Sequence, residues 1–208
     1  MGQKKSLGIL GGTFDPIHYG HLLAGEWVRE VYHLDQLIFM PAARPPHKDL
    51  SGVLDSQRRY RMVELAVSDN PGFSVSNLEL ERSGLSYTVD TVRYYLQEYP
   101  HTDIYFIVGV DALQLMHTWK DAEQLVELCR FIVVTRPGYE LDRNDPALQI
   151  LPGVLWERLA LLSIPGLEIS SSDIRQRVMH GLSIRYLLPS AEDKYIQDNH
   201  LYKNLQGE

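Results

Sequence analysis

The residues of this chain best suited to phosphate chemistry lie between positions 11 and 22, which read GGTFDPIHYGHL. His18 and His21 are three residues apart, so in a helix their side chains project from the same face. Two imidazoles placed in this way can hydrogen-bond phosphoryl oxygens and stabilise developing negative charge without acting as nucleophiles. Gly20, between them, has no side chain that could block a ligand. The pattern predicts a site that binds a phosphate group and acts on it.

The start of this segment has the composition of a loop that lets a ligand approach the backbone. Gly11 and Gly12 follow an apolar run, and Pro16 is suited to a turn that leads into a helix. Unpaired amides in the first turn of a helix favour an anion. Neither GxGxxG nor GxxxxGK[ST] occurs in the chain, which excludes the dinucleotide fingerprint and the P-loop. We therefore expect a phosphate-binding loop of another kind.

Two other interpretations of the histidine pair stay open. His-x-x-His with Asp15 nearby could ligate a metal, although zinc usually takes three or four protein ligands. The pair could also be two ordinary, half-buried histidines. The surrounding GGTFDP favours the phosphate interpretation over both.

A second candidate phosphate site is the segment 168–178, EISSSDIRQRV. Ser171 or Ser172 can cap a helix here and leave other first-turn amides for phosphate oxygens, and Asp173 is a normal first-turn acid. Arg175 is unusual, because a cation near the positive end of a helix is unfavourable by roughly 0.3–1 kcal/mol unless an anion offsets it. A β,γ-phosphate would be such an anion, and a solvated surface arginine is the alternative.

Short apolar runs alternate with longer amphipathic stretches along the chain, which is typical of an α/β protein. We expect a doubly wound parallel sheet with right-handed crossovers, in which ligands bind beyond the carboxyl ends of the strands. That edge would gather GGTFDPIH, VGVD and EISSSD, because each follows an expected strand. The expected strands or extended segments are 6–10, 36–41, 73–80, 103–110, 130–138 and 159–170, and the expected helices are 18–34, 56–68, 86–99, two within 111–129, and 171–181.

The length of 208 residues suits one sizeable core. We expect a single domain over 1–208 with a C-terminal helical segment from about 171. Residues 137–158 show no clear pattern and are interpreted as a surface excursion. The single cysteine, Cys129, precedes the apolar run FIVVT, which predicts a buried, reduced thiol and excludes an internal disulfide.

Charge and hydropathy exclude two classes of partner. The 20 Lys and Arg residues against 27 Asp and Glu residues give a net charge of −7, so the chain is a poor candidate for binding nucleic acid. No apolar run approaches the roughly 20 residues that span a bilayer, and the N-terminus lacks the apolar stretch of a signal peptide. These features predict a cytoplasmic protein that does not bind a membrane.

The two motif segments together resemble the nucleotidyltransferase superfamily. GTFDPIHYGHL is similar to its (T/H)xGH signature, and Ile169, Ser170, Ser171, Ile174 and Arg175 match its ISSxxIR signature. The resemblance implies a Rossmann-like nucleotidyltransferase fold and direct in-line attack of an acceptor on the α-phosphorus of a nucleoside triphosphate, with release of pyrophosphate. It also implies that Mg²⁺ arrives with ATP, without a side-chain metal ligand. The catalytic residues would be His18, His21 and Arg175, and the residues near the ATP phosphates would be Gly11, Gly12, Thr13, Phe14, Gly20, Ser171 and Ser172.

Five further segments resemble bacterial nicotinate-nucleotide adenylyltransferases. They are PAARPPHK, SYTVDT, VGVD, the region of Trp119 and the closing YIQDNHLY, and only residues 139–158 lack a recognisable motif. The resemblance implies transfer of the adenylyl group of ATP to nicotinate mononucleotide (NaMN), giving nicotinate adenine dinucleotide (NaAD) and pyrophosphate in NAD biosynthesis.

The residues themselves are consistent with that acceptor. Ser86 could cap the helix that follows it and leave the amides of Tyr87 and Thr88 for a carboxylate such as that of nicotinate. Trp119 offers an aromatic plane for a pyridine ring. Lys48 could meet the acceptor's phosphate as a point charge. An ordinary helix cap, a half-buried tryptophan and a solvated lysine are the alternatives.

The segment VGVD is expected to meet the nucleoside of ATP. Asp111, just past a buried strand, could accept hydrogen bonds from the ribose or the amino group of adenosine, and Gly109 would give the nucleotide close access. Asp111 might equally be the N-cap of the next helix. Arg136, also at a strand end, is a reserve candidate.

Two rival functions and the oligomeric state stay open at this point. Phosphopantetheine adenylyltransferase shares both signatures, although the length of this chain and its PPHK and SYTVDT segments argue against it. A nucleotide-binding sensor without turnover is the rival from another class, and intact His18, His21 and Arg175 argue against it. The sequence is compatible with a homodimer but does not predict one.

Overall fold

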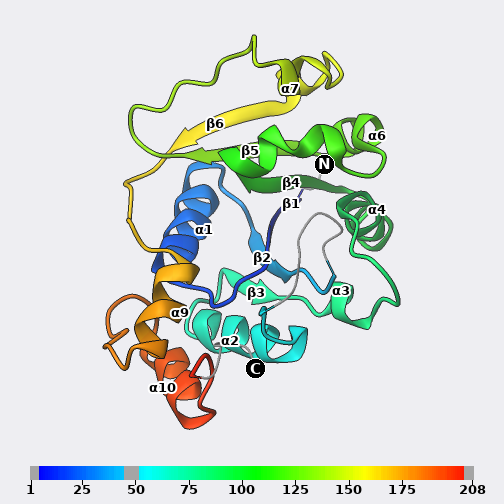
Figure 1. Ribbon diagram of the computed structural model, residues 1–208. Coiled ribbons are helices and arrows are strands. Elements are labelled where there is room, and N and C mark those ends of the chain that lie inside the picture. The colour runs from blue at the N-terminus through cyan, green and yellow to red at the C-terminus, as the bar shows by residue number, and fades with distance from the viewer. Residues whose placement is uncertain (1–4, 45–51, 204–208) are drawn as a thin grey trace.

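The computed structural model describes residues 5–44 and 52–203, and the strands within these ranges form one parallel sheet (Figure 1). The strand order is β3-β2-β1-β4-β5-β6. This order confirms the expected doubly wound sheet, because the chain first builds outward from β1 to β3 and then returns to pair β4 with the other side of β1. The strands are β1 (Lys5–Gly12), β2 (Gln36–Pro41), β3 (Phe73–Val75), β4 (Thr102–Gly109), β5 (Arg130–Thr135) and β6 (Leu159–Ser163).

Helices cover both faces of the sheet (Figure 1). Helices α1, α2, α9 and α10 lie on one face, and α4 and α6 lie on the other. The helices of the described residues are α1 (Tyr19–Val31), α2 (Ser56–Val67), α3 (Leu78–Glu81), α4 (Thr88–Glu98), α5 (Val110–Gln114), α6 (Ala122–Leu128), α7 (Pro146–Gln149), α8 (Leu155–Arg158), α9 (Ser171–Met179), α10 (Ser190–Asp198) and the 3-10 turn η1 (Met116–Thr118).

Alternate strand residues enter two separate cores. Leu10 and Phe39 belong to the core beneath α1 and α2, whereas Ile9, Ile38 and Met40 belong to the core beneath α4 and α6. The side chains of a strand alternate between the two faces of a sheet. A sheet buried on both faces explains why its strands read as almost continuous apolar runs.

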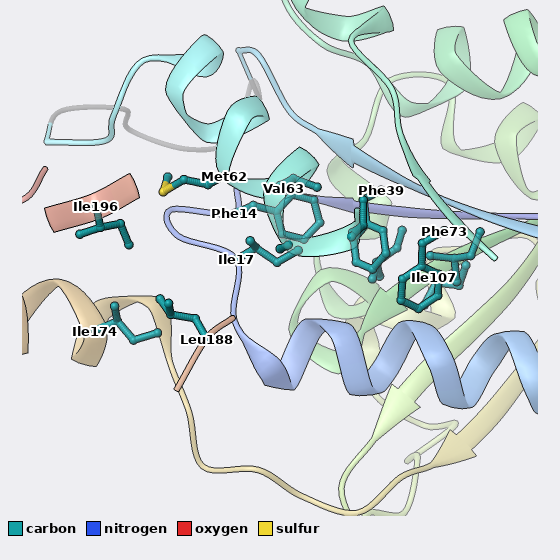
Figure 2. Packing of buried hydrophobic residues seen from close by; sticks show 14 of the residues in the cluster. Phe14, Ile17, Phe39, Met62, Val63, Phe73, Ile107, Ile174, Leu188 and Ile196 are labelled. Carbon is teal, nitrogen blue, oxygen red and sulfur yellow. The ribbon is translucent and has the colours of Figure 1, made fainter. Parts of the chain in front are cut away.

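The core beneath α1 and α2 extends to the C-terminal helices. Figure 2 shows Phe14 and Ile17, which follow β1, close to Met62 of α2, and it shows Ile174 of α9 and Ile196 of α10 in the same cluster. Helix α10 packs against α2 (Figure 1). The expected helical segment from about residue 171 is therefore built into the core that carries the first motif.

Several helix boundaries differ from those expected by one to three residues. The helix expected over 18–34 covers Tyr19–Val31, with His18 as its N-cap, and His33 beyond its end has a positive φ of 49°. The helix expected from 86 begins at Thr88 after the N-cap Tyr87. Neither difference alters the order of elements, because helix ends depend on local capping bonds that the apolar period does not encode.

Residues 137–158 are more than a surface excursion, so that expectation was wrong. This stretch contains α7 and α8, and Leu148, Leu151 and Leu155 are buried in the core beneath α4 and α6. The elements are only four residues each, too short for a helical period to be recognised. The segment 73–80 likewise divides into a three-residue strand and the start of α3.

The structure bears on two further expectations. Cys129 is buried, as expected, and burial raises the pKa of its thiol to about 12, so it stays protonated and unreactive. Within residues 5–44 and 52–203, none of the helices has both the length and the apolar character needed to cross a membrane.

Candidate active site

A cleft of about 850 Å³ opens beyond the carboxyl ends of β1, β4 and β5. This is where a doubly wound sheet binds its ligands, and the volume lies within the usual range for a small-molecule site. The cleft collects most of the residues that the sequence singles out: Gly11, Gly12, Thr13, His18, Gly20, His21, Ser86, Tyr87, Thr88, Gly109, Asp111, Trp119 and the reserve candidate Arg136.

Five predicted residues stand apart from that lining. Phe14, Ser171, Ser172 and Arg175 do not line the cleft as described, and Lys48 lies outside the described residues. Phe14 is buried, and its ring lies beneath Gly12, where a Cβ atom would come within 2.7 Å of it. Gly11 and Gly12 are the last residues of β1 and have no positive φ, so the expectation of a loop at these glycines was wrong. Phe14 packs against this strand end.

The two histidines lie side by side at the start of α1, with ring centroids 3.8 Å apart. His18 precedes the helix and caps it: its Nδ1 accepts the backbone N–H of Gly20 at 3.2 Å. A backbone N–H can only donate, so the ring hydrogen of a neutral His18 is on Nε2. Burial lowers the pKa of His18 to about 4, which keeps the imidazole neutral at pH 7. His18 thus offers one N–H donor without carrying a charge.

The surroundings of the pair explain two other residues of the motif. The ring of His21 meets the ring of Phe14 edge-on, with centroids 5.1 Å apart. A Cβ atom at Gly20 would lie 3.0 Å from the His18 ring. Glycine at this position therefore leaves room for the capping imidazole, a reason that differs from the expected one of leaving room for a ligand.

The second motif, at the start of α9, contacts the backbone of the first motif at Asp15 and Pro16. Ser170 is the N-cap of α9, and its Oγ accepts the backbone N–H of Asp173 at 3.0 Å, so the expectation of a cap at Ser171 or Ser172 was wrong by one or two residues. The Oγ of Ser171 donates instead to the carbonyl of Pro16 at 2.8 Å. The chain thus joins two segments that are 155 residues apart in sequence.

Arg175 has an anionic neighbour in the protein itself. Its Nη1 donates to the carbonyl of Asp15 at 2.6 Å and lies 3.7 Å from the Asp15 carboxylate, and its Nη2 donates to Ser172 at 3.2 Å. Asp15 therefore offsets the unfavourable position of this cation in the first turn of α9. Contact between Arg175 and a phosphate stays a prediction.

Two residues behind the first motif were missed by the sequence reasoning. Tyr202 donates its hydroxyl to Oδ1 of Asp15 at 2.8 Å, and the guanidinium of Arg59 donates to the carbonyl of Thr13 at 2.6 Å. Both residues are buried. The only available signal was the presence of YIQDNHLY among the resembling segments, which gave no role to its last tyrosine.

The side of the cleft predicted to receive the acceptor is organised differently from what the sequence suggests. Ser86 does not cap α4: its N–H donates to the carbonyl of Arg44 at 3.0 Å, and its Oγ accepts the N–H of Arg44 at 3.2 Å. Tyr87 is the N-cap, without a side-chain capping bond, and Thr88 is the first helical residue. Ser86 thus fixes the position of the helix start through a loop 42 residues away.

Glu79 is a further residue of the cleft that sequence reasoning missed, because LELE reads as the end of an extended segment. It is buried, lines the cleft, and accepts the hydroxyl of Thr91 at 2.9 Å. Burial raises the pKa of its carboxyl, while hydrogen bonds from Thr91, Ser86 and the backbone of Ala43 oppose that shift. Glu79 therefore joins three segments on the side of the cleft that carries Ser86.

Aromatic and polar groups complete the cleft. Trp119 is half-buried and meets Phe106 edge-on at 6.2 Å, and Lys120 lies 4.6 Å from the centre of the Tyr87 ring. Gly109 is the N-cap of α5, so Asp111 lies in the first turn and is not the cap. A Cβ atom at Gly109 would meet nothing within 4 Å, which leaves the backbone open to the cleft.

A metal site built from side chains was also considered. Within residues 5–44 and 52–203, no three His, Cys, Asp or Glu side chains gather closely enough to hold a metal ion. Mg²⁺ bound through ATP stays a prediction.

Known proteins resemble the chain over almost its whole length. Residues 9–177 match the family described as cytidylyltransferase-like. The "Probable nicotinate-nucleotide adenylyltransferase" of Thermoanaerobacter sp. (strain X514) is 46% identical over 98% of this chain and 97% of its own. The protein of the same name from Moorella thermoacetica is 48% identical over 95% of this chain and 91% of its own.

Solved structures share the fold at much lower identity. The Plasmodium falciparum nicotinic acid mononucleotide adenylyltransferase complexed with NaAD has a TM-score of 0.76 and 22% identity, over 95% of this chain and 97% of that one. The same enzyme complexed with APC gives a TM-score of 0.74. At this level of identity the likeness confirms the architecture of the sheet and its helices.

Proposed function

The chain belongs to the cytidylyltransferase-like family, and on that premise we propose that it is a nicotinate-nucleotide adenylyltransferase of NAD biosynthesis. It transfers the adenylyl group of ATP to NaMN and releases NaAD and pyrophosphate. The observation that carries the proposal is the pair His18 and His21, side by side on the wall of a cleft large enough for both substrates. The relatives named above supply the identity of the acceptor.

The reaction needs stabilisation of charge more than it needs a protein nucleophile. An oxygen of the NaMN phosphate attacks the α-phosphorus of ATP, and the bond from that phosphorus to the oxygen bridging to the β-phosphate breaks, so pyrophosphate leaves. His18 and His21 donate hydrogen bonds to oxygens of the α-phosphate as negative charge develops on them. Mg²⁺ carried by ATP would shield the charge of the triphosphate.

The ends of β1 and β4 receive the ATP. Gly11 and Gly12 line the cleft with their backbone, and a Cβ atom at either position would press on Phe106 or Phe14. At Gly109 the space is open, so the nucleoside can approach the backbone there. Asp111 lines the cleft beside Gly109 and accepts hydrogen bonds from adenosine. Arg175 and Ser171 of α9 support the first motif through the carbonyls of Asp15 and Pro16, and a contact between Arg175 and the leaving phosphates stays a prediction.

The opposite side of the cleft receives NaMN. Thr88 opens α4, so its amide belongs to the positive end of the helix and suits the carboxylate of nicotinate. Trp119 lies on the same wall and offers its face to the pyridine ring. A pocket that combines a helix end with an aromatic plane recognises an aromatic acid.

The reaction is tested with purified protein, ATP and three acceptors in parallel: NaMN, nicotinamide mononucleotide and phosphopantetheine. We expect pyrophosphate release with NaMN and a product with the mass of NaAD. Turnover with phosphopantetheine instead would replace the proposed acceptor. Binding of ATP without pyrophosphate release from any acceptor would favour the sensor.

The same assay measures the preference for the acid over the amide. A carboxamide gains less from the helix end and turns an NH₂ group toward donors, and such a mismatch can discriminate by about 10⁴. We expect kcat/KM for NaMN to exceed that for the amide by orders of magnitude. Trp119→Ala should lower the use of both acceptors, whereas Trp27→Ala, on α1 outside the cleft lining, should not. Equal efficiency with both mononucleotides would contradict the carboxylate assignment.

A further inference from the structure

We infer that Arg59 is a positioning residue that holds the ATP side and the acceptor side of the cleft in one fixed relation. The inference rests on the proposed function, because it concerns the alignment of the two substrates. Arg59 lies on α2 and does not line the cleft. Its effect on the reaction would therefore pass through the backbone segments that it binds.

Arg59 binds three separate segments of backbone. Its Nη1 donates to the carbonyl of Thr13 at 2.6 Å, its Nη2 to the carbonyl of Ala42 at 2.8 Å and its Nε to the carbonyl of Leu54 at 2.9 Å. A longer contact of 3.5 Å reaches the carbonyl of Ala43. One side chain thus connects the ends of β1 and β2 with the start of α2.

Two of these segments belong to opposite sides of the cleft. Thr13 follows the end of β1 on the side proposed for the ATP phosphates, and Ala42 lines the cleft after β2, on the side of Glu79 and Ser86. The N–H of Ala42 also donates to the carbonyl of Gly12 at 2.9 Å. The guanidinium of Arg59 therefore holds the segments after β1 and β2 together at the point where they are already hydrogen-bonded.

The chemistry of the contacts requires a guanidinium. Its donors point in fixed directions within one plane, whereas an ammonium is a single point charge on a flexible stem. Only the planar, forked guanidinium can donate to the three carbonyls at once, because they approach from three directions. Lysine at this position would keep the charge and lose the geometry.

The burial of Arg59 argues against a mere contribution to stability. Only 1% of its surface is exposed, and burial lowers the pKa of the guanidinium, while the negative charges of Asp15 and Asp55 oppose that shift. A buried charge is expensive, and apolar residues of similar volume often stabilise a fold as well or better. A guanidinium can hydrogen-bond the backbone carbonyls beside the cleft and fix their positions, whereas an apolar side chain cannot.

The test compares Arg59→Lys with Arg58→Lys, a matched control one residue earlier. Arg58 is exposed and pairs with Asp55 at 3.2 Å. A misplacement of about 1 Å can cost about 10² in rate, so we expect kcat per active site to fall at least tenfold in Arg59→Lys, with KM for each substrate within about threefold. Arg58→Lys should match wild type within about twofold.

A second readout does not depend on turnover. The N–H of Ala42 reports the contact between the two loops, so its hydrogen exchange should become at least tenfold faster in Arg59→Lys and stay unchanged in Arg58→Lys. An unchanged exchange rate in Arg59→Lys overturns the inference, as does a kcat within twofold of wild type per folded molecule. Absence of turnover in wild type would instead overturn the proposed function, and the exchange measurement would still decide the role of Arg59.

Discussion

The two motif segments of this chain touch each other, yet they face different surroundings. The first segment, residues 11–21, places its glycines and histidines on the wall of the cleft. The second, at the start of α9, directs Ser171 and Arg175 to the backbone carbonyls of Pro16 and Asp15, on the far side of that loop. In the proposed function the first segment presents donors to the ligand, and the second supports the loop that carries them. Substitutions in the first segment should therefore lower the reaction rate, whereas substitutions in the second should lower the stability of the fold.

The largest effect is expected from removing the histidine donors. His18→Asn keeps a side-chain acceptor for the Gly20 N–H, so it removes the imidazole while retaining the helix cap. We expect kcat to fall by about 10²–10³ in His18→Asn and in His21→Ala. His33→Asn, at an exposed position with positive φ, is the control that should leave kcat unchanged. Near-normal turnover of either folded variant would show that the substituted histidine does not stabilise the transition state.

The next effect is on stability as a function of pH. The pKa of His18 is about 4 in the folded protein and near 6.5 when unfolded, so the unfolded chain binds more protons between these values. Stability is fully present above pH 6.5 and is lost as pH falls toward 4, by at most about 3 kcal/mol. Urea unfolding at pH 7 and pH 5 should show this loss in wild type and a smaller one in His18→Asn. Identical pH dependence in the two proteins would mean that His18 is not held neutral by the fold.

The contribution of the second segment to stability should be measurable in the protein without any ligand. Arg175→Ala removes the hydrogen bond to the Asp15 carbonyl and the nearby charge, and we expect the free energy of unfolding to fall by about 2 kcal/mol. Lys194→Ala, which breaks an exposed pair on α10, should change it by less than about 0.5 kcal/mol. If unliganded Arg175→Ala melts like wild type, Arg175 does not support the loop, and a direct role at the phosphates becomes the better explanation.

The smallest effect tests the support given to Asp15 by the end of the chain. Tyr202→Phe keeps the buried ring and removes only the hydroxyl that donates to Asp15, which should cost about 1–1.5 kcal/mol of stability. We expect kcat to change by less than about threefold. Tyr186→Phe is the control, because Tyr186 is 82% exposed. A large loss of kcat in Tyr202→Phe, at unchanged stability, would show that Asp15 acts in the reaction itself.

The sequence predicts what depends on local pattern and leaves out what depends on distant contacts. The doubly wound parallel sheet and the place of His18 and His21 follow from apolar runs, glycines and spacing. Within the run of three serines at 170–172, the N-cap could not be identified, because each serine can accept the same kind of bond. Tyr202 meets Asp15 across 187 residues, a pairing that no local pattern encodes.

The side of the cleft proposed for the acceptor illustrates the same limit. Ser86 looks like a helix cap from its neighbours, but it is used by the loop at Arg44, and Glu79 becomes part of the cleft only when three segments come together. Arg59 lies in the run RRYR, where three arginines look alike until the fold buries one of them. Burial is a property of the assembled fold, so it separates residues that the sequence presents as equivalent.

The central claim, that His18 and His21 stabilise charge at the reacting phosphate, is tested most directly in the double variant His18→Asn/His21→Ala. The measurement is the single-turnover rate with saturating ATP and NaMN, together with the Kd of ATP for the same preparation. We predict that the rate falls by more than about 10³ while the Kd of ATP stays within about threefold, because donors aimed at the transition state add little to ground-state binding. The claim would be contradicted if the double variant bound ATP much more weakly but had a normal single-turnover rate at saturating ATP. The loss of rate at subsaturating ATP would then come from weaker binding alone.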